Sequence, residues 1–235
     1  MRLPIRLLAP VLLAAGPLLT GCGGPEPLPE TAPAPRPTSA QPSALAPSTD
    51  APSTAHPSSA GPSGPAVAAA SLGGPGTACP LPVSFSLPKD WKPNAIELPM
   101  DPELADLADL ARRGPAVMRC EIDAKPAGLI GFLRVWTLEK GSAQPSARAA
   151  LEAFVKGDET SSAVTYREIE AGALPAVEAT YTVRSALFDE DKEERAFAVT
   201  TPKGVVVVDL GGTDTAEHRE MLPAYELART TLKAL

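Results

Sequence analysis

Two histidines, His56 and His218, are the residues around which an acid–base or nucleophilic site would be built. A Ser-His or Cys-His catalytic unit needs its histidine beside a nucleophile. The sequence has no Gly-x-Ser-x-Gly elbow, and His56 stands alone in a proline-rich segment. His218 falls near the start of an expected helix, where we predict a surface position. We assign neither histidine a catalytic role.

Carboxylates and glycines offer two further kinds of chemistry. The acidic run Asp189–Glu194 concentrates oxygen ligands that calcium could use, but it lacks the glycine turn and the spaced glutamate of an EF-hand. We interpret it as a solvated hairpin tip. Gly211 and Gly212 follow an apolar strand without a phosphate-binding motif, so we interpret them as turn residues. We therefore predict no metal site, no cofactor, no catalytic residue and no enzymatic activity.

Cys22 is the residue whose position predicts a defined modification. It follows two arginines and the apolar run Leu7–Leu19, which is typical of a secretory signal peptide. That run is shorter than the roughly 20 residues that cross a bilayer as a helix. Leu19-Thr20-Gly21-Cys22 resembles the bacterial lipobox. The resemblance implies a signal peptide over residues 1–21 and acyl chains such as palmitate on Cys22; the alternative is an ordinary signal with an unmodified cysteine.

Cys79 and Cys120 remain as an even pair once Cys22 is lipidated. Disulfides persist in the oxidising compartment to which a signal peptide leads. We predict that the two are joined, which would stabilise the fold by roughly 3–4 kcal/mol through loop closure. Two free buried thiols are the alternative.

The composition divides the chain into an anchor, a linker and a domain. Residues 22–78 are rich in Pro, Ala, Ser and Thr and contain no aromatic residue, so we expect a disordered linker, either plain or O-glycosylated. Every aromatic residue lies between Phe85 and Tyr225, which predicts a single globular domain over residues 79–235. We expect that domain to fold without the linker, with Trp91 and Trp136 in its core. The net charge of −7 argues against nucleic acid as a partner.

Hydrophobic periodicity predicts an α+β domain in which helices pack on an antiparallel sheet. Helices are expected over 101–113, with Asp101 as N-cap, and over 145–157. A last helix, capped by Asp214 or Thr215, is expected to run to the C-terminus, and Pro223 should break or kink its first turn. Strands are expected over 82–88, 116–122, 128–139, 174–185, 194–201 and 204–210. The 174–185 strand alternates so that Glu178 and its neighbours form a solvated face, whereas the valine run 205–208 predicts a central strand.

Four features together resemble the Mog1/PsbP-like fold. They are the strand "FSLPKDW", a helix before "EIEAGALPAVEATYTV", a hairpin into "GVVVVDL", and a C-terminal helix. With the lipobox and the proline-rich linker, the combination is similar to the LpqN/LpqT-type lipoproteins of actinobacteria. The resemblance implies a non-enzymatic binding or adaptor domain outside the membrane, and it carries over no functional residue.

The sequence thus predicts a protein anchored through Cys22 to the outer face of the cell membrane, with a protein partner in the envelope. One alternative is a carrier of a small ligand or lipid, which would need an apolar cavity between sheet and helices. An envelope enzyme is a further alternative, which would need a cleft with convergent carboxylates or with His218 at its base.

Overall fold

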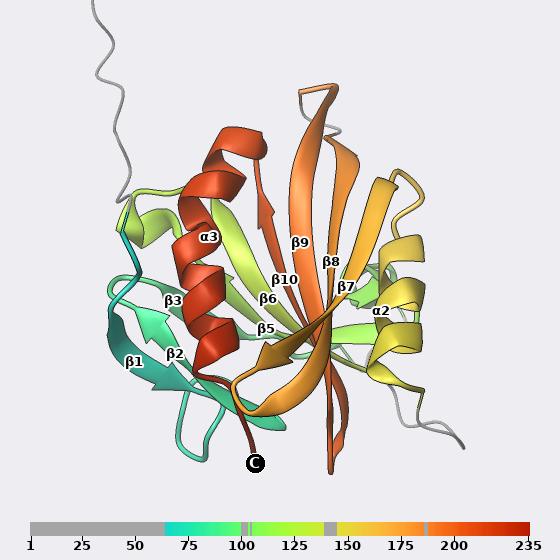
Figure 1. Cartoon of the computed structure of the whole chain (residues 1–235). Helices are drawn as coiled ribbons and strands as arrows, with labels where there is room; N and C mark the ends of the chain where they lie inside the picture. Colours follow the sequence, from blue (N-terminus) through green and yellow to red (C-terminus); the bar gives the residue numbers. More distant parts are fainter. Residues whose placement is uncertain (1–63, 100–102, 104, 139–144, 186–187) are drawn as a thin grey trace, which may run out of the picture. The chain divides into compact units, whose positions relative to one another are not determined.

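A computed structural model describes residues 64–99, 103, 105–138, 145–185 and 188–235, and it shows two sheets with helices packed against them (Figure 1). Cys22, the expected linker up to residue 63, and the expected N-cap Asp101 lie outside these ranges. The main sheet comprises β3 (Lys92–Ala95), β4 (Arg112–Arg113), β5 (Ala116–Asp123), β6 (Gly131–Leu138), β7 (Ser162–Ala171), β8 (Leu174–Ser185), β9 (Glu190–Thr201) and β10 (Gly204–Gly212). The small sheet comprises β1 (Ala68–Leu72), β2 (Val83–Pro88) and β11 (Lys233–Ala234), and the helices are α1 (Ala105–Asp109), α2 (Ala147–Lys156), α3 (Thr215–Thr230) and the 3-10 turn η2 (Lys125–Ala127).

All strand pairs of both sheets are antiparallel, so the predicted fold class is confirmed. The main sheet runs in the order β3-β5-β6-β10-β9-β8-β7, with β4 pairing beside β3 on β5. The valine-rich strand β10 occupies the middle of this order, as its apolar residues on both faces predicted. The tight turn between β9 and β10 closes at the pair Thr201 and Gly204.

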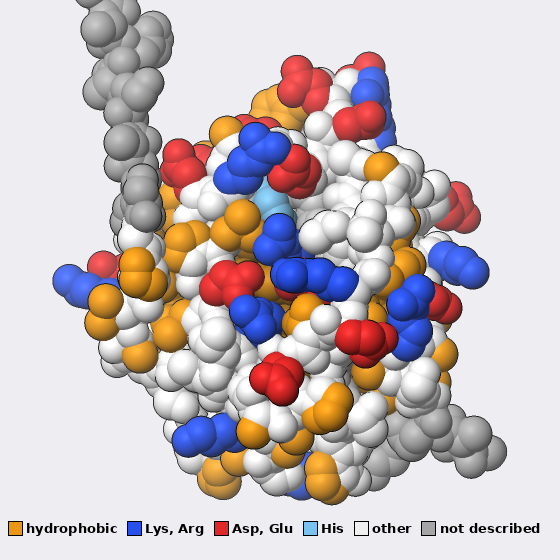
Figure 2. Space-filling model, viewed as in Figure 1, with side chains coloured by type: hydrophobic (Ala, Val, Ile, Leu, Met, Phe, Trp, Pro, Cys, Tyr) orange, Lys and Arg blue, Asp and Glu red, His pale blue; other side chains and the backbone are white. Residues whose placement is uncertain are grey.

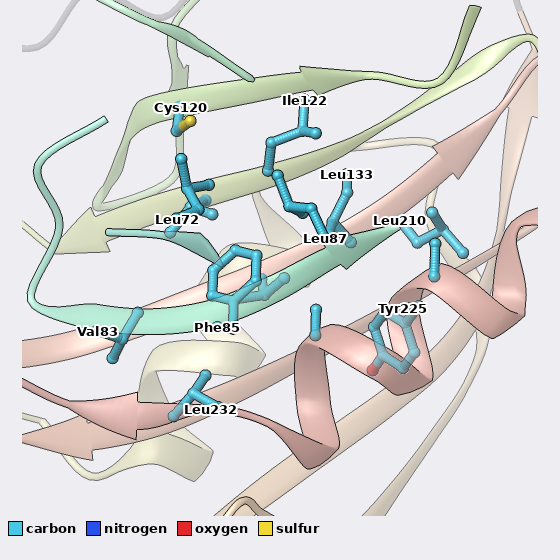
Figure 3. Close-up of a cluster of buried hydrophobic side chains, with 14 of the residues drawn as sticks. Leu72, Val83, Phe85, Leu87, Cys120, Ile122, Leu133, Leu210, Tyr225 and Leu232 are labelled. Carbon is cyan, nitrogen blue, oxygen red and sulfur yellow. The ribbon is translucent and has the colours of Figure 1, made fainter. Parts of the chain in front are cut away.

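One face of the main sheet, which we call the α3 face, is covered by α3 and the small sheet. Strand β2 alternates buried and half-buried side chains, and its buried residues point at α3 and the main sheet (Figure 3). Tyr225 from α3 packs edge-on against Phe197 at 5.4 Å between ring centroids. The core on this face includes Val83, Phe85, Leu87, Ile122, Leu133, Val208, Leu210, Met221, Tyr225 and Leu232.

The opposite face, which we call the α2 face, is covered by the shorter helix α2. Ser146 caps α2 by accepting a hydrogen bond from the backbone N–H of Ala149 at 3.1 Å. Its buried residues, Leu151 and Phe154 among them, pack on β8, β9 and β10. Trp136 lies in this core, and Trp91 lies in the core of the α3 face, so both tryptophans are core residues as predicted.

The helix expected over 101–113 is wrong at its C-terminal end. Helix α1 spans only Ala105–Asp109, and Arg112–Arg113 forms strand β4, which pairs with the start of β5. Gly114 makes the reversal possible because its φ of 55° is in the left-handed region. The hairpin therefore outweighs the helix-forming tendency of the preceding residues.

The closing helix has one of its two expected caps but differs from its prediction at Pro223 and at its end. Asp214 is the N-cap and accepts a hydrogen bond from the backbone N–H of Glu217 at 2.9 Å. Helix α3 then continues through Pro223, which neither ends it nor lies in its first turn. Leu232 and Leu235 follow the helix, and the chain between them pairs with β2 as β11.

The folded part of the chain begins before residue 79, where the sequence placed its boundary. Ala68–Leu72 forms strand β1 on the edge of the small sheet, and Leu72 is buried in the core of the α3 face. Four of the five residues of β1 are exposed, and its sequence, AAASL, does not alternate apolar with polar residues. The sequence therefore gave no signal for this strand. A protein that begins at Gly76 would lose this strand.

Cys79 and Cys120 form a disulfide, as predicted. Both residues are buried in the core of the α3 face, and they link the loop that precedes β2 to β5 of the main sheet. The bond therefore ties the small sheet to the main sheet.

Candidate functional site

A charged hollow lies on the α2 face where helix α2 ends. Its volume is about 490 Å³, and its lining includes Arg113, Arg134, Glu121, Asp158 and Trp136. Helix α2 has only ten residues and covers the apolar part of this face, so the remaining part is occupied by charged side chains. We call this charged hollow the arginine hollow.

Arg113 is the central cation of the arginine hollow. Its guanidinium donates to Asp158 at 3.3 Å and to Glu194 at 3.5 Å, and it lies 4.5 Å above the ring of Phe154. Burial by itself lowers the pKa of Arg113, but the charges of Tyr181, Asp209, Glu194 and Asp158 outweigh burial and raise it. Arg113 is therefore a fixed positive charge whose two terminal nitrogens donate to carboxylates, whereas its buried Nε has no hydrogen-bond partner among the described residues.

Glu194 shows that the expected solvated hairpin tip is only partly correct. The exposed residues Asp189–Asp191 fit that expectation, but the side chain of Glu194 is 8 % exposed and accepts a hydrogen bond from Lys192 at 2.8 Å. Gly211 lies opposite Glu194 within strand β10, where a Cβ atom would come 3.2 Å from the glutamate Oε1. The glycine is thus a strand residue that leaves space for a buried carboxylate, and not a turn residue as predicted; Gly212 is likewise the last residue of β10.

Asp209 is a buried carboxylate within the valine-rich strand. It accepts a hydrogen bond from the indole N–H of Trp136 and is 1 % exposed. Burial raises its pKa, and the nearby charges of Arg134 and Arg113 act in the opposite direction. Arg134 in turn pairs with Glu121 at 2.8 Å, so the network extends across β5, β6 and β10.

Glu178 forms a second buried charge site, on the α3 face. The sequence placed it on a solvated face, but it is fully buried. Its carboxylate accepts from Tyr225 at 3.0 Å and pairs with Arg167 at 2.6 Å. Burial and the charge of Glu178 raise the pKa of Tyr225 well above its ordinary value. In Figure 2, basic and acidic side chains gather over the strip between α3 and strands β7–β9.

His218 is buried, contrary to the predicted surface position. It is 2 % exposed, and its Nδ1 atom has no hydrogen-bond partner among the described residues. Burial, followed by the positive charge of Arg195, lowers its pKa to about 4. His218 is therefore a neutral side chain beneath the N-terminal half of α3.

An open, mostly apolar groove lies beside α3. Its volume is about 690 Å³, and Pro65, Ala66, Leu222, Pro223 and Leu227 contribute to its lining. No helix in the described part of the chain is long and apolar enough to cross a membrane. The described residues also contain no cluster of three or more His, Cys, Asp or Glu side chains placed to hold a metal ion.

The model of a family described as uncharacterised lipoproteins matches residues 49–232. The chain belongs to this lipoprotein family. Membership places the protein among membrane-anchored proteins of the cell envelope. No curated protein sequence matches this lipoprotein.

The solved structures that are similar to the lipoprotein include the following two. The solution structure of cyanobacterial PsbP (CyanoP) from Synechocystis sp. PCC 6803 is 13 % identical, with a TM-score of 0.43 over 70 % of this chain and 97 % of that chain. The crystal structure of a protein of unknown function, PA94 from Pseudomonas aeruginosa, described as a putative regulator, is 16 % identical. Its TM-score is 0.38 over 65 % of this chain and 91 % of that chain.

The charged residues of the lipoprotein are the part of the site that sequence reasoning missed. Asp209 within "VVVVDL" was a usable signal, since a carboxylate in a central strand must be buried and needs a partner. Arg113 gave no such signal, because it was expected in a helix. No pattern in the sequence predicted that Asp209 and Arg113 would lie close to Glu194.

Proposed function

We propose that this lipoprotein is held at the outer face of the cell membrane by acyl chains on Cys22, and that its domain binds a protein partner in the envelope without catalysing a reaction. We also propose that the protein is of the LpqN/LpqT type of actinobacterial lipoproteins, which its sequence resembles. Membership of a lipoprotein family and the spacing of the lipobox support the anchor. Two acyl chains hold a protein on a membrane stably, whereas one chain does not.

The observation that carries the binding role is that two buried carboxylates, Glu194 and Glu178, are each paired with a cation. Glu194 is paired with Arg113 and Lys192, and Glu178 is paired with Arg167. A guanidinium or ammonium that donates to a carboxylate occupies lone pairs of that carboxylate, and such charge-assisted hydrogen bonds are stronger than neutral ones. These ion pairs favour a structural role for the buried charged residues. We therefore assign recognition of the partner to residues on the protein surface.

The anchor is tested by Cys22→Ala in the full-length protein. The variant should lose radiolabelled palmitate and should move from the membrane fraction to the soluble fraction. The binding role is tested by cross-linking in intact cells, in which one envelope protein should be captured reciprocally, with either protein as bait. Membrane retention of the variant would contradict the anchor, and the absence of a reciprocal cross-link would contradict the binding role.

A carrier of an apolar ligand is the second candidate function, and the groove beside α3 favours it. Its lining residues Leu222, Pro223 and Leu227 are apolar, and its volume of about 690 Å³ is within the usual range of small-molecule sites. A fluorescent fatty acid should bind the wild-type protein and should bind Leu227→Asp more weakly. Equal binding by both proteins, or none by the wild type, would end this candidate.

A further inference from the structure

The two edges of the main sheet differ in how they are protected. At one edge, β3 has four residues that include Lys92 and Pro93, and β4 has two. Short strands, lysine and proline are the usual devices that prevent an edge from pairing with another chain. The other edge of the sheet is formed by β7 (Figure 1). This strand runs for ten residues, Ser162–Ala171, and most of its side chains are exposed.

The register of β7 shows which of its backbone groups point away from the sheet. Glu170 lies opposite Pro175 of β8, and a proline has no N–H to donate. Glu170 therefore belongs to a non-hydrogen-bonded pair, and its backbone groups point outward. The hydrogen bond from the guanidinium of Arg229 to the backbone carbonyl of Glu170, at 2.7 Å, agrees with this orientation.

The alternation of an antiparallel pair extends this orientation along the strand. If the groups of Glu170 point outward, so do the backbone N–H and C=O groups of Glu168 and Tyr166. Within the described part of the chain, no group bonds the backbone of these two residues on the outer side. The free stretch is bounded by Arg229 at one end and by the irregular pairing between Ser162 and Thr165 at the other.

The side chains beside this free edge are acidic. Glu168 and Glu170 are exposed, alternate with Arg167 and Ile169, and therefore lie on the same face. Neither carboxylate forms an ion pair with any described residue. The neighbouring cation on the other face, Arg167, is already held by the buried Glu178. An incoming strand would thus meet two unpaired negative charges spaced two residues apart.

A second copy of this chain fits the edge poorly in the registers centred on the charged residues of β7, and a register centred on Tyr166 would draw on the irregular stretch between Ser162 and Thr165. An antiparallel two-fold pairing centred on Glu168 places that glutamate opposite itself, and one centred on Ile169 places Glu168 opposite Glu170. A pairing centred on Arg167 places two guanidinium groups opposite each other. Like charges directly opposite each other destabilise a strand pair.

We infer that β7 is a docking edge for an extended segment of another envelope protein, one that carries Lys or Arg at every second position. The segment adds a strand to the sheet through the outward backbone groups of Tyr166 and Glu168, and its cations pair with Glu168 and Glu170. Main-chain hydrogen bonds supply affinity in this mode of recognition, and alternate side chains supply specificity. The inference names the partner surface of the proposed function and rests on that function.

The test uses the full-length protein in a zwitterionic detergent and a synthetic peptide of alternating lysine and valine. Peptide binding should slow hydrogen exchange at the amides of Tyr166 and Glu168 by about tenfold or more, as expected for new backbone hydrogen bonds. A peptide of the same charge, N-methylated on the nitrogens that would face β7, should bind at least about tenfold more weakly. Equal binding of both peptides would mean that only the opposite charges attract each other, without backbone hydrogen bonds, and would overturn the inference. Unchanged hydrogen exchange at the amides of Tyr166 and Glu168 would also overturn it.

Charge reversal supplies a matched pair of variants. Glu168→Lys with Glu170→Lys should weaken peptide binding about tenfold or more, whereas Glu159→Lys with Glu190→Lys makes the same charge change at exposed sites and should have much less effect. Unchanged exchange in β10 checks that each variant is folded. Equal weakening by both pairs would overturn the inference. If the peptide does not bind at β7 while reciprocal cross-links still form in cells, only the assignment of the docking surface to β7 is wrong. If the peptide binds at β7 and no cross-link forms in cells, the proposed function is wrong.

Discussion

The two faces of the main sheet are closed in different ways. On the α3 face, a sixteen-residue helix, the small sheet and a disulfide enclose an apolar core that contains one fully buried carboxylate, Glu178. On the α2 face, a ten-residue helix covers the apolar residues, and ion pairs around Arg113 occupy the rest. The difference indicates that charge pairs take the place of a longer helix on the α2 face, so that face should be the more sensitive to loss of a single charge.

Loss of Arg113 should have the largest effect. Arg113→Ala leaves Glu194 buried with only Lys192 to compensate it and removes the contact with Phe154. We expect the free energy of unfolding in urea to fall by about 3 kcal/mol. Arg184→Ala removes a guanidinium that pairs with exposed aspartates at the β8–β9 turn, and it should leave the midpoint nearly unchanged. Similar losses in both variants would remove the distinction between buried and surface pairs.

The buried His218 should make the α3 face sensitive to acid. Its pKa of about 4 in the folded protein lies below the ordinary value of about 6.5 in the unfolded chain. Between these values the unfolded chain binds more protons, so stability decreases as the pH falls from about 6.5 to 4, by on the order of 2–3 kcal/mol. Urea unfolding at several pH values should show this loss, and His218→Gln should show a smaller one. Identical pH profiles would assign the effect to other groups.

Tyr225→Phe should have the smallest effect of the three. It removes one hydrogen bond to Glu178, whose carboxylate keeps its pairing with the partly exposed Arg167. The expected loss is about 1 kcal/mol in urea unfolding. A loss as large as that of Arg113→Ala would mean that the two faces depend equally on their charges.

The sequence predicted the elements that have clear periodicity and missed those that depend on distant contacts. The valine run of β10 and the capped helix α2 were predicted because their patterns are local. Strand β4 was missed, since it exists only through its pairing with β5, and β1 was missed because its residues are mostly exposed. The cysteine count was sufficient for the disulfide, but no spacing rule brings Arg113, Glu194 and Asp209 together from three separate strands.

Photo-cross-linking in living cells tests the central claim most directly. A photoreactive amino acid placed at Glu168 on β7 should capture one envelope protein, and the cross-linked peptide of that protein should be basic and extended. The same amino acid at Asn94 on β3, the protected edge, should capture no partner above background. Capture of the same protein from both positions, or from neither, would contradict the claim that this lipid-anchored protein binds its partner through strand β7.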